Sequence, residues 1–257
     1  GELRHLGVPY ANFVTGDGEG LDAAILKLYA KEIGVKYVYV KTDWSNFISD
    51  LSGEKIRVDG SKVKVIGAAP VKGDIIGNGL TIIPWRESVI DFSVPYFPTA
   101  IWVLASSKSN LQPIRPSGDL KKDIAATRYL LKDKNVLSVR NTCVDLNLYN
   151  VPEAHPVYKN DITPNDLAGA VVKGAAELTI LDVPDTLVAL VKFPGQIKVL
   201  GTITESQSMG FGFSKKSPEL KSSFNEFLAR IKKTGQLGKL IGEYYPAMKH
   251  YFPDSVK

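Results

Sequence analysis

Hydrophobic and polar positions along this chain change period repeatedly, and the changes predict alternating strands and helices. Apolar residues recur at helical spacing over residues 21–33, and Gly34 follows where a C-terminal cap glycine belongs. Short apolar, β-branched runs predict strands at residues 3–8, 35–40, 74–77, 100–105, 135–139, 177–181, 197–200 and 209–213. Further helical patterns cover residues 120–131, 143–148, 166–173, 218–234 and 236–245, and Asp43 is expected to cap a short helix. This alternation predicts an α/β fold with largely parallel sheets.

Residues 55–66 follow a different pattern. Apolar and polar residues alternate there about the pair Asp59-Gly60, which is a strong short-range signal for a β-hairpin. Such a hairpin could line a ligand cleft, contact a partner or be a tolerated insertion, and the sequence leaves these alternatives open.

The size and composition are those of an ordinary globular protein. The chain has 257 residues, of which 44% are hydrophobic and 23% charged, enough for one large or two small domains. No apolar run approaches the roughly 20 residues that a membrane-spanning helix needs. A basic segment followed by an apolar core is also missing, so we expect that a signal peptide was removed or never present.

Charge and residue types argue against several function classes. The net charge is +5, but lysine and arginine are scattered among acidic residues, which disfavours a nucleic-acid partner. Cys143 is the only cysteine, so an internal disulfide is excluded, and the three histidines have no metal-ligand spacing. Neither a phosphate-binding glycine loop nor a nucleophile elbow is present. We therefore expect no metal, no cofactor and no enzymatic activity.

Thr81 and Arg86 form the most informative local pattern. They lie five positions apart, after a predicted strand and at the start of a predicted helix. Helix starts expose unpaired N–H groups, and the planar guanidinium matches the two oxygens of a carboxylate. The pattern indicates a site for a small anion, and the alternative is a surface arginine beside an ordinary helix cap.

The order of motifs resembles the type II periplasmic solute-binding proteins of family 3, which bind amino acids for ABC importers. It is also similar to the non-catalytic domain at the front of some membrane-bound lytic transglycosylases. The resemblance covers nearly the whole chain. Its motifs are Gly20-Leu21-Asp22, Asp43-Trp44, Gly73-Asp74-Ile75-Ile76, Gly79-Leu80-Thr81-Ile82, Arg86, Ile90-Asp91-Phe92-Ser93-Val94-Pro95-Tyr96, Leu181-Asp182-Val183-Pro184 and residues 227–235.

The resemblance implies a two-lobed fold of the Venus-flytrap type, with a mostly parallel, helix-flanked sheet in each lobe and two crossing hinge segments. Lobe 1 would comprise residues 1–98 plus 206–257, and lobe 2 residues 99–205. It further implies a monomer in the periplasm or outside the cell, with an ABC permease in the membrane as its partner. A lipid anchor, present before trimming, is compatible with that location.

The family's binding residues carry over to lobe 1 as follows. Arg86 would hold the α-carboxylate of the ligand, assisted by the N–H group and hydroxyl of Thr81, and the Gly79 carbonyl would accept from the α-ammonium group. Tyr10 and Trp44 would pack on the ligand's side chain. The alternatives are a core position for Tyr10 and packing of Trp44 on its neighbours Phe47 and Ile48.

In lobe 2, Asp182 would pair with the ammonium group, and the amides of Asn141 and Thr142 at a helix start would close on the carboxylate. The alternatives are that Asp182 caps a helix or turn before Pro184 and that Asn141-Thr142 is an ordinary N-cap. Cys143 departs from the family pattern, and we interpret it as a small buried side chain that could approach the pocket. We interpret Asp91, in lobe 1, as structural.

A zwitterion removed from water needs both charges paired, which is the physical reason for an arginine and an aspartate on opposite lobes. Tyr10 and Trp44 favour an apolar, aromatic or cationic ligand side chain, whereas Arg140 would favour an acidic one. The sequence leaves two other functions open. One is a sensor or regulatory domain of a larger protein. The other is a dehydratase of aromatic-acid biosynthesis, with Asp145, Asp182 and Asp185 as candidate acids.

Overall fold

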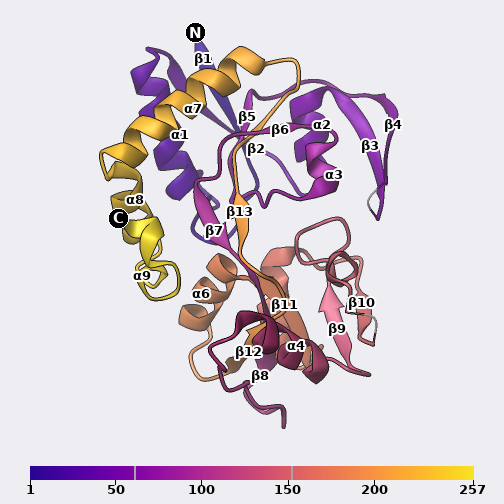
Figure 1. Ribbon diagram of the computed structural model, residues 1–257. Coiled ribbons are helices and arrows are strands. Elements are labelled where there is room, and N and C mark those ends of the chain that lie inside the picture. The colour runs from indigo at the N-terminus through magenta and orange to yellow at the C-terminus, as the bar shows by residue number, and fades with distance from the viewer. Residues whose placement is uncertain (61, 152) are drawn as a thin grey trace. The chain divides into compact units, whose positions relative to one another are not determined.

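The computed structural model describes residues 1–60, 62–151 and 153–257, and Figure 1 shows its elements. The chain divides into two compact units, Gly1–Pro98 with Ser208–Lys257, and Thr99–Gln207. The boundaries fall inside β7 (Phe97–Thr99) and β13 (Gln207–Met209), two short strands that pair with each other. The chain therefore passes between the units twice, and the first unit is built from two separate stretches of sequence.

The first unit contains a five-stranded mixed sheet in the order β2-β1-β5-β14-β6. β1 pairs in parallel with β2 and β5, and β14 pairs antiparallel with β5 and β6. β14 comes from the second stretch of sequence and lies between two strands of the first. The bounds are β1 (Glu2–Gly7), β2 (Lys36–Lys41), β5 (Ile75–Ile76), β6 (Asp91–Phe92) and β14 (Gly212–Phe213).

Helices from both stretches pack together in the first unit. Tyr29 of α1 lies against two rings of α7, at 5.0 Å from Phe224 and 5.3 Å from Phe227. α2 packs on β1 and β5. The helices are α1 (Leu21–Glu32), α2 (Phe47–Ser52), α3 (Pro84–Glu87), α7 (Pro218–Lys233), α8 (Gln236–Tyr244), α9 (Met248–Tyr251) and the short 3-10 helix η3 (Pro253–Val256).

The predicted hairpin is confirmed. β3 (Glu54–Asp59) and β4 (Lys62–Ala68) form an antiparallel ribbon beside α2, with Gly60 in the left-handed region at φ +60° (Figure 1). Apolar residues face each other across the ribbon in the pairs Ile56–Val65 and Val58–Val63. Ser61, part of the predicted pattern, lies outside the described residues.

The second unit contains its own five-stranded mixed sheet, in the order β10-β9-β11-β8-β12. β9 pairs in parallel with β10 and β11, and β8 pairs antiparallel with β11 and β12. The strands are β8 (Ile101–Ser106), β9 (Asn135–Ser138), β10 (His155–Tyr158), β11 (Leu178–Asp182) and β12 (Ile197–Thr202). The helices are α4 (Leu120–Leu130), α5 (Leu167–Val172), α6 (Val183–Lys192) and the 3-10 turns η1 (Leu146–Tyr149) and η2 (Pro164–Asp166). A separate hydrophobic core, which includes Ile101, Leu137, Leu167 and Ile180, fills this unit.

Three sequence predictions are wrong at the level of local structure. Asp43 does not cap α2, since that helix begins after Asn46, and the Asp43 carboxylate instead closes a turn by accepting from the Ser45 and Asn46 N–H groups. Residues 209–213 form no single strand, because the chain leaves β13 and enters β14 of a different sheet. The predicted helix over residues 143–148 is replaced by a turn followed by η1.

None of the helices in the described part of the chain is long and apolar enough to cross a membrane.

Candidate functional site

Three of the predicted residues in the first unit follow the ends of neighbouring parallel strands. Tyr10 comes after β1, Trp44 after β2 and Gly79 after β5. Parallel strands end at the same edge of a sheet, which is where open α/β sheets place ligands. The rings of Tyr10 and Trp44 are in edge-to-face contact at 5.4 Å. The structure therefore brings these two aromatic residues together.

Arg86 is almost fully buried, with 1% of its surface exposed. Its Nη1 donates to the Thr81 carbonyl at 2.9 Å, and its guanidinium carbon lies 5.8 Å from the ring centre of Phe47. Phe47 in turn contacts Trp44 at 5.8 Å. Arg86 is therefore linked to Trp44 and Tyr10 through Phe47. It is the third residue of α3, a helix of only four residues. The predicted helix after Thr81 is therefore present but short.

Several buried polar atoms of the first unit have no hydrogen-bond partner within the part of the chain that the structure describes. They are the Thr81 hydroxyl, both polar atoms of the Asn78 amide and the indole nitrogens of Trp44 and Trp85. Buried polar groups without partners are rare, because each one loses its hydrogen bonds to water without replacement. Asn78 was missed by sequence reasoning, although a polar residue at the carboxyl end of a parallel strand is a usable signal.

The loop that carries Asn78 and Gly79 is held by two buried side chains. Nε2 of His5 lies 2.6 Å from the Gly77 carbonyl, and Nδ1 lies 2.7 Å from the Tyr37 hydroxyl. A carbonyl only accepts, so Nε2 carries the proton and Nδ1 accepts from Tyr37. Burial lowers the pKa of His5 to about 4, which keeps the ring neutral at physiological pH.

Asp22, at the start of α1, holds the other end of the loop. Its Oδ2 accepts the Gly79 N–H at 2.8 Å. Burial raises the pKa of Asp22 to about 7, against the opposing effect of the hydrogen bonds from Tyr96 and Gly79. The sequence pattern contained Asp22 only as part of a motif, without a role.

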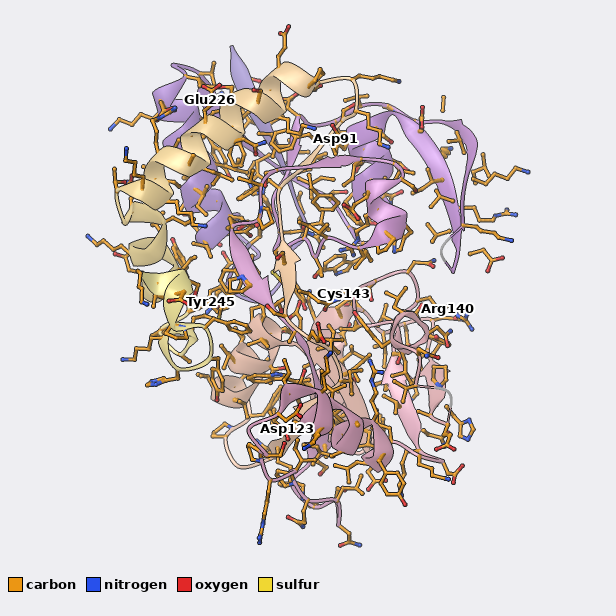
Figure 2. The ribbon with its side chains drawn as sticks, in the orientation of Figure 1. Asp91, Asp123, Arg140, Cys143, Glu226 and Tyr245 are labelled. Carbon is orange, nitrogen blue, oxygen red and sulfur yellow. The ribbon has the colours of Figure 1, made fainter. Side chains whose placement is uncertain are left out.

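The second unit repeats this arrangement at the carboxyl ends of its parallel strands. Asp182 is the last residue of β11, and residues 140–143 follow β9. The Cys143 sulfur lies 3.9 Å from Asp182 Oδ2, so the structure brings this aspartate next to the Asn141-Thr142 segment. Cys143 and Arg140 both lie beyond the end of β9 (Figure 2). Cys143 is buried, in agreement with its interpretation as a small buried side chain.

Asn141 and Thr142 do not begin a helix. Asn141 has φ +60°, and its N–H donates to the Asp145 carboxylate at 3.2 Å. The Thr142 hydroxyl donates to the Val139 carbonyl at 2.8 Å and accepts from the Val144 N–H at 3.2 Å. These bonds between side chains and backbone stabilise a turn in place of the predicted helix.

Asp182 has a structural contact as well. Its carboxylate caps α6 by accepting the Asp185 N–H at 3.1 Å, one of the alternatives that the sequence left open. Burial and the neighbouring Asp182 charge raise the pKa of Asp185 well above its usual range. Arg140 lies 3.8 Å above the ring of Tyr158, the last residue of β10.

Asp91 has a structural contact in the first unit. It forms an ion pair at 2.5 Å with Lys221 of α7, and Figure 2 labels it beside that helix.

Comparison with known proteins places this geometry in context. The chain is 22% identical over 241 residues to the L-cystine-binding protein TcyJ of Escherichia coli, covering 93% of this chain and 79% of the relative. Among solved structures, a putative ABC-transporter binding component from Wolinella succinogenes, complexed with lysine, has a TM-score of 0.76 at 22% identity, covering 95% of this chain and 96% of that one. The ancestral amino-acid-binding protein AncCDT-1, described as a precursor of cyclohexadienyl dehydratase, has a TM-score of 0.71 at 26% identity, with 95% of each chain covered.

These similarities agree with the two-lobed binding-protein fold expected from the motifs. Residues 67–247 match the family described as bacterial extracellular solute-binding proteins, family 3, and this match covers well over half of the chain. The chain therefore belongs to the family-3 bacterial extracellular solute-binding proteins.

Proposed function

We propose that this protein captures an amino acid, or a closely related zwitterionic carboxylate, for uptake by an ABC transporter. The two compact units are the two lobes in this proposal, and the ligand is bound when they close on it. The relatives support this ligand class, since one binds L-cystine and a structural neighbour is complexed with lysine.

Arg86 carries the proposal for the first lobe. A buried guanidinium beside the Thr81 hydroxyl, which has no hydrogen-bond partner among the described residues, suits a carboxylate, which can accept from both groups at once. We assign the α-carboxylate to Arg86 and Thr81, and the α-ammonium group to the Gly79 carbonyl. The edge-to-face pair of Tyr10 and Trp44 would pack on the ligand's side chain.

The second lobe supplies the opposite charge. We propose that Asp182 pairs with the ammonium group, in addition to its capping bond, because a carboxylate has acceptor sites for more than one donor. Both side-chain hydrogen bonds of Thr142 are used within the turn, so we assign the role of Asn141-Thr142 to the backbone of that turn. Paired charges at both ends of the ligand would offset the large penalty for removing a zwitterion from water.

The remaining expectations complete the proposal. The protein would act in the periplasm or outside the cell, as a monomer, and would present its closed form to a membrane permease.

We propose binding in preference to catalysis. Burial and the charge of Asp182 raise the pKa of Asp185, but this side chain is buried and lies within the first turn of α6. A general acid must reach the leaving group of a substrate, and a buried side chain in a helix turn does not meet this requirement.

A thermal-shift screen of amino acids tests the ligand class. One or a few amino acids should raise the melting temperature of the wild-type protein, because a ligand that binds only the folded state stabilises it. Arg86→Lys keeps the charge but loses the two-pronged geometry, and Arg86→Met removes the charge. We expect Arg86→Lys to weaken the shift and Arg86→Met to abolish it.

The matched control is Arg115→Met, at an exposed position of the second unit. It removes an arginine without touching the site and should keep the full ligand shift. Melting of the ligand-free variants shows whether they fold. A folded Arg86→Met variant with an undiminished shift would contradict the assignment of Arg86.

A further inference from the structure

The carboxylate of Asp22 is buried, with 1% of the residue exposed, and accepts two hydrogen bonds from different parts of the first unit. Oδ2 accepts the Gly79 N–H at 2.8 Å, and Oδ1 accepts the Tyr96 hydroxyl at 2.5 Å. Charged groups are rarely buried without such pairing. One carboxylate therefore connects the loop after β5 with the segment that precedes β7.

The Gly79 end of this connection is held in a strict geometry. Gly79 has φ +63°, and a side-chain carbon at this position would come within 2.2 Å of the Phe13 ring. Phe13 is fully buried and packs on Phe97 and Tyr245, both at 5.0 Å. The hydrogen bond to Asp22 fixes the direction of the Gly79 amide, and with it the peptide that follows Asn78.

The Tyr96 end leads directly to the two strands that connect the units. Its backbone N–H donates to the Met209 carbonyl of β13 at 3.1 Å, and the next residue begins β7. Its ring packs on Phe211 at 4.7 Å. Tyr96 therefore joins both connecting strands through its backbone, and joins Asp22 through its hydroxyl.

We infer that Asp22 is a positioning residue that couples the Gly79 loop to the connecting strands β7 and β13. The inference rests on the proposed function, in which the Gly79 loop contacts the ligand. Ligand contact at the loop then changes the geometry of the segments about which the two units are linked. No contact between Asp22 and the ligand itself is required.

The ionisation of Asp22 gives the coupling a measurable signal. Burial raises its pKa to about 7, so the charge on this link changes within an accessible pH range. The titratable groups around it are Tyr96 and Tyr37, whose pKa values burial raises above their usual range, and Tyr245, which faces Tyr96. His5 stays neutral throughout that range because burial lowers its pKa to about 4. Asp22 is thus the group in this cluster whose charge is expected to change near pH 7.

Amide NMR of the ligand-free protein tests the connection directly. In the wild-type protein, the amide signals of Gly79, Phe97 and Thr99 should shift between pH 5 and pH 9 with one common midpoint. Asp22→Asn, which keeps the shape but cannot ionise, should make all three signals independent of pH. Tyr96→Phe should keep the Gly79 shift and lose those of Phe97 and Thr99.

Asp91→Asn is the matched control, since it removes another carboxylate of the first unit outside this cluster. It should leave the common midpoint in place. If Gly79 titrated while Phe97 and Thr99 stayed constant in the wild-type protein, the coupling would be refuted. A Gly79 signal that is constant in the wild-type protein would refute the role of Asp22 altogether.

Ligand affinity provides the second measurement. With an amino acid found by the thermal-shift screen, wild-type affinity should rise several-fold from pH 6 to pH 8, because the ionised carboxylate holds the Gly79 amide more strongly. Affinity of Asp22→Asn should be constant over this range, and Asp91→Asn should follow the wild type. Equal pH profiles for the wild type and Asp22→Asn would refute the positioning role. Failure to find any amino-acid ligand would contradict the proposed function alone, since the NMR measurement needs no ligand.

Discussion

At the scale of single residues, Asp22 is a source of pH-dependent stability. An aspartate in the unfolded chain titrates near its usual value of 3.8, whereas burial raises the pKa of Asp22 in the folded protein to about 7. Between these values the folded state binds the proton more tightly than the unfolded state does. The free energy of unfolding therefore falls as pH rises from about 4 to about 7, and this contribution is constant above that range.

We predict that Asp22→Asn gains stability relative to the wild type as pH rises. The wild type loses free energy of unfolding, on the order of 4 kcal/mol, as Asp22 ionises with rising pH. The variant cannot ionise at this position and does not undergo that loss. Urea unfolding at pH 5, 6, 7 and 8 should show the difference widening toward high pH. The Asp91→Asn control should run parallel to the wild-type curve, and a constant difference for Asp22→Asn would contradict the buried, proton-binding state.

Sequence reasoning and structure differ most in what single residues do. Arg86, Thr81, Tyr10 and Trp44 were named from motifs as binding residues. The structure connects them through a series of contacts, and their binding roles stay predictions. Asn78 could not be named in this way, because only the folded chain reveals that its side-chain amide has no hydrogen-bond partner among the described residues. The capping bond of Asp182 was one of two alternatives, and the second role proposed for it remains a prediction.

At the scale of elements, the loop after β5 combines two separate constraints. Gly79 and Gly118 both have positive φ, at +63° and +82°. Only Gly79 is also crowded, since a side-chain carbon at Gly118 would meet no atom within 4 Å. Comparing alanine substitutions at the two positions therefore distinguishes the cost of backbone strain from the cost of steric overlap.

We predict that Gly118→Ala lowers the free energy of unfolding by about 1–2 kcal/mol, the typical penalty for a left-handed non-glycine residue. Gly79→Ala should lower it by clearly more, because the buried Phe13 ring must also move. Chemical denaturation of both variants measures the difference. Equal losses would indicate that the packing around Phe13 is looser than the structure shows.

Periodicity predicted the long elements well and the short, polar ones poorly. The helical patterns at residues 218–234 and 236–245 correspond to α7 and α8, which bury one apolar face each. The helix predicted over residues 143–148 fails because Asp145 bonds to the Asn141 and Asn147 N–H groups and closes a turn. α6 was not predicted, although its apolar residues recur at helical spacing and Pro184 lies in its first turn, where helices accept proline.

At the scale of the whole molecule, the two units differ in continuity. The second unit is a single stretch with its own hydrophobic core. The first unit depends on both ends of the chain, because β14 lies between β5 and β6 in its sheet. Parallel strands were expected from the alternation of elements, whereas the antiparallel strands that complete each sheet depend on long-range pairing that local pattern does not reveal.

We predict that a fragment of residues 99–207 folds by itself and melts cooperatively, because a domain with its own core can do so. A fragment of residues 1–98 should not, since β6 would have no neighbour and β5 would lose one side. Circular dichroism and thermal melting of both fragments measure this. A cooperative transition in the fragment of residues 1–98 would show that β14 is dispensable for that sheet.

The insertion of β14 between β5 and β6 also bears on biosynthesis. A ribosome produces β14 only after the entire second unit, so the unit at the beginning of the chain is completed last. This reverses the usual order in which amino-terminal domains mature first. Until residue 213 emerges, the nascent amino-terminal strands have unpaired edges, and this period is when we expect the growing polypeptide to be most dependent on chaperones.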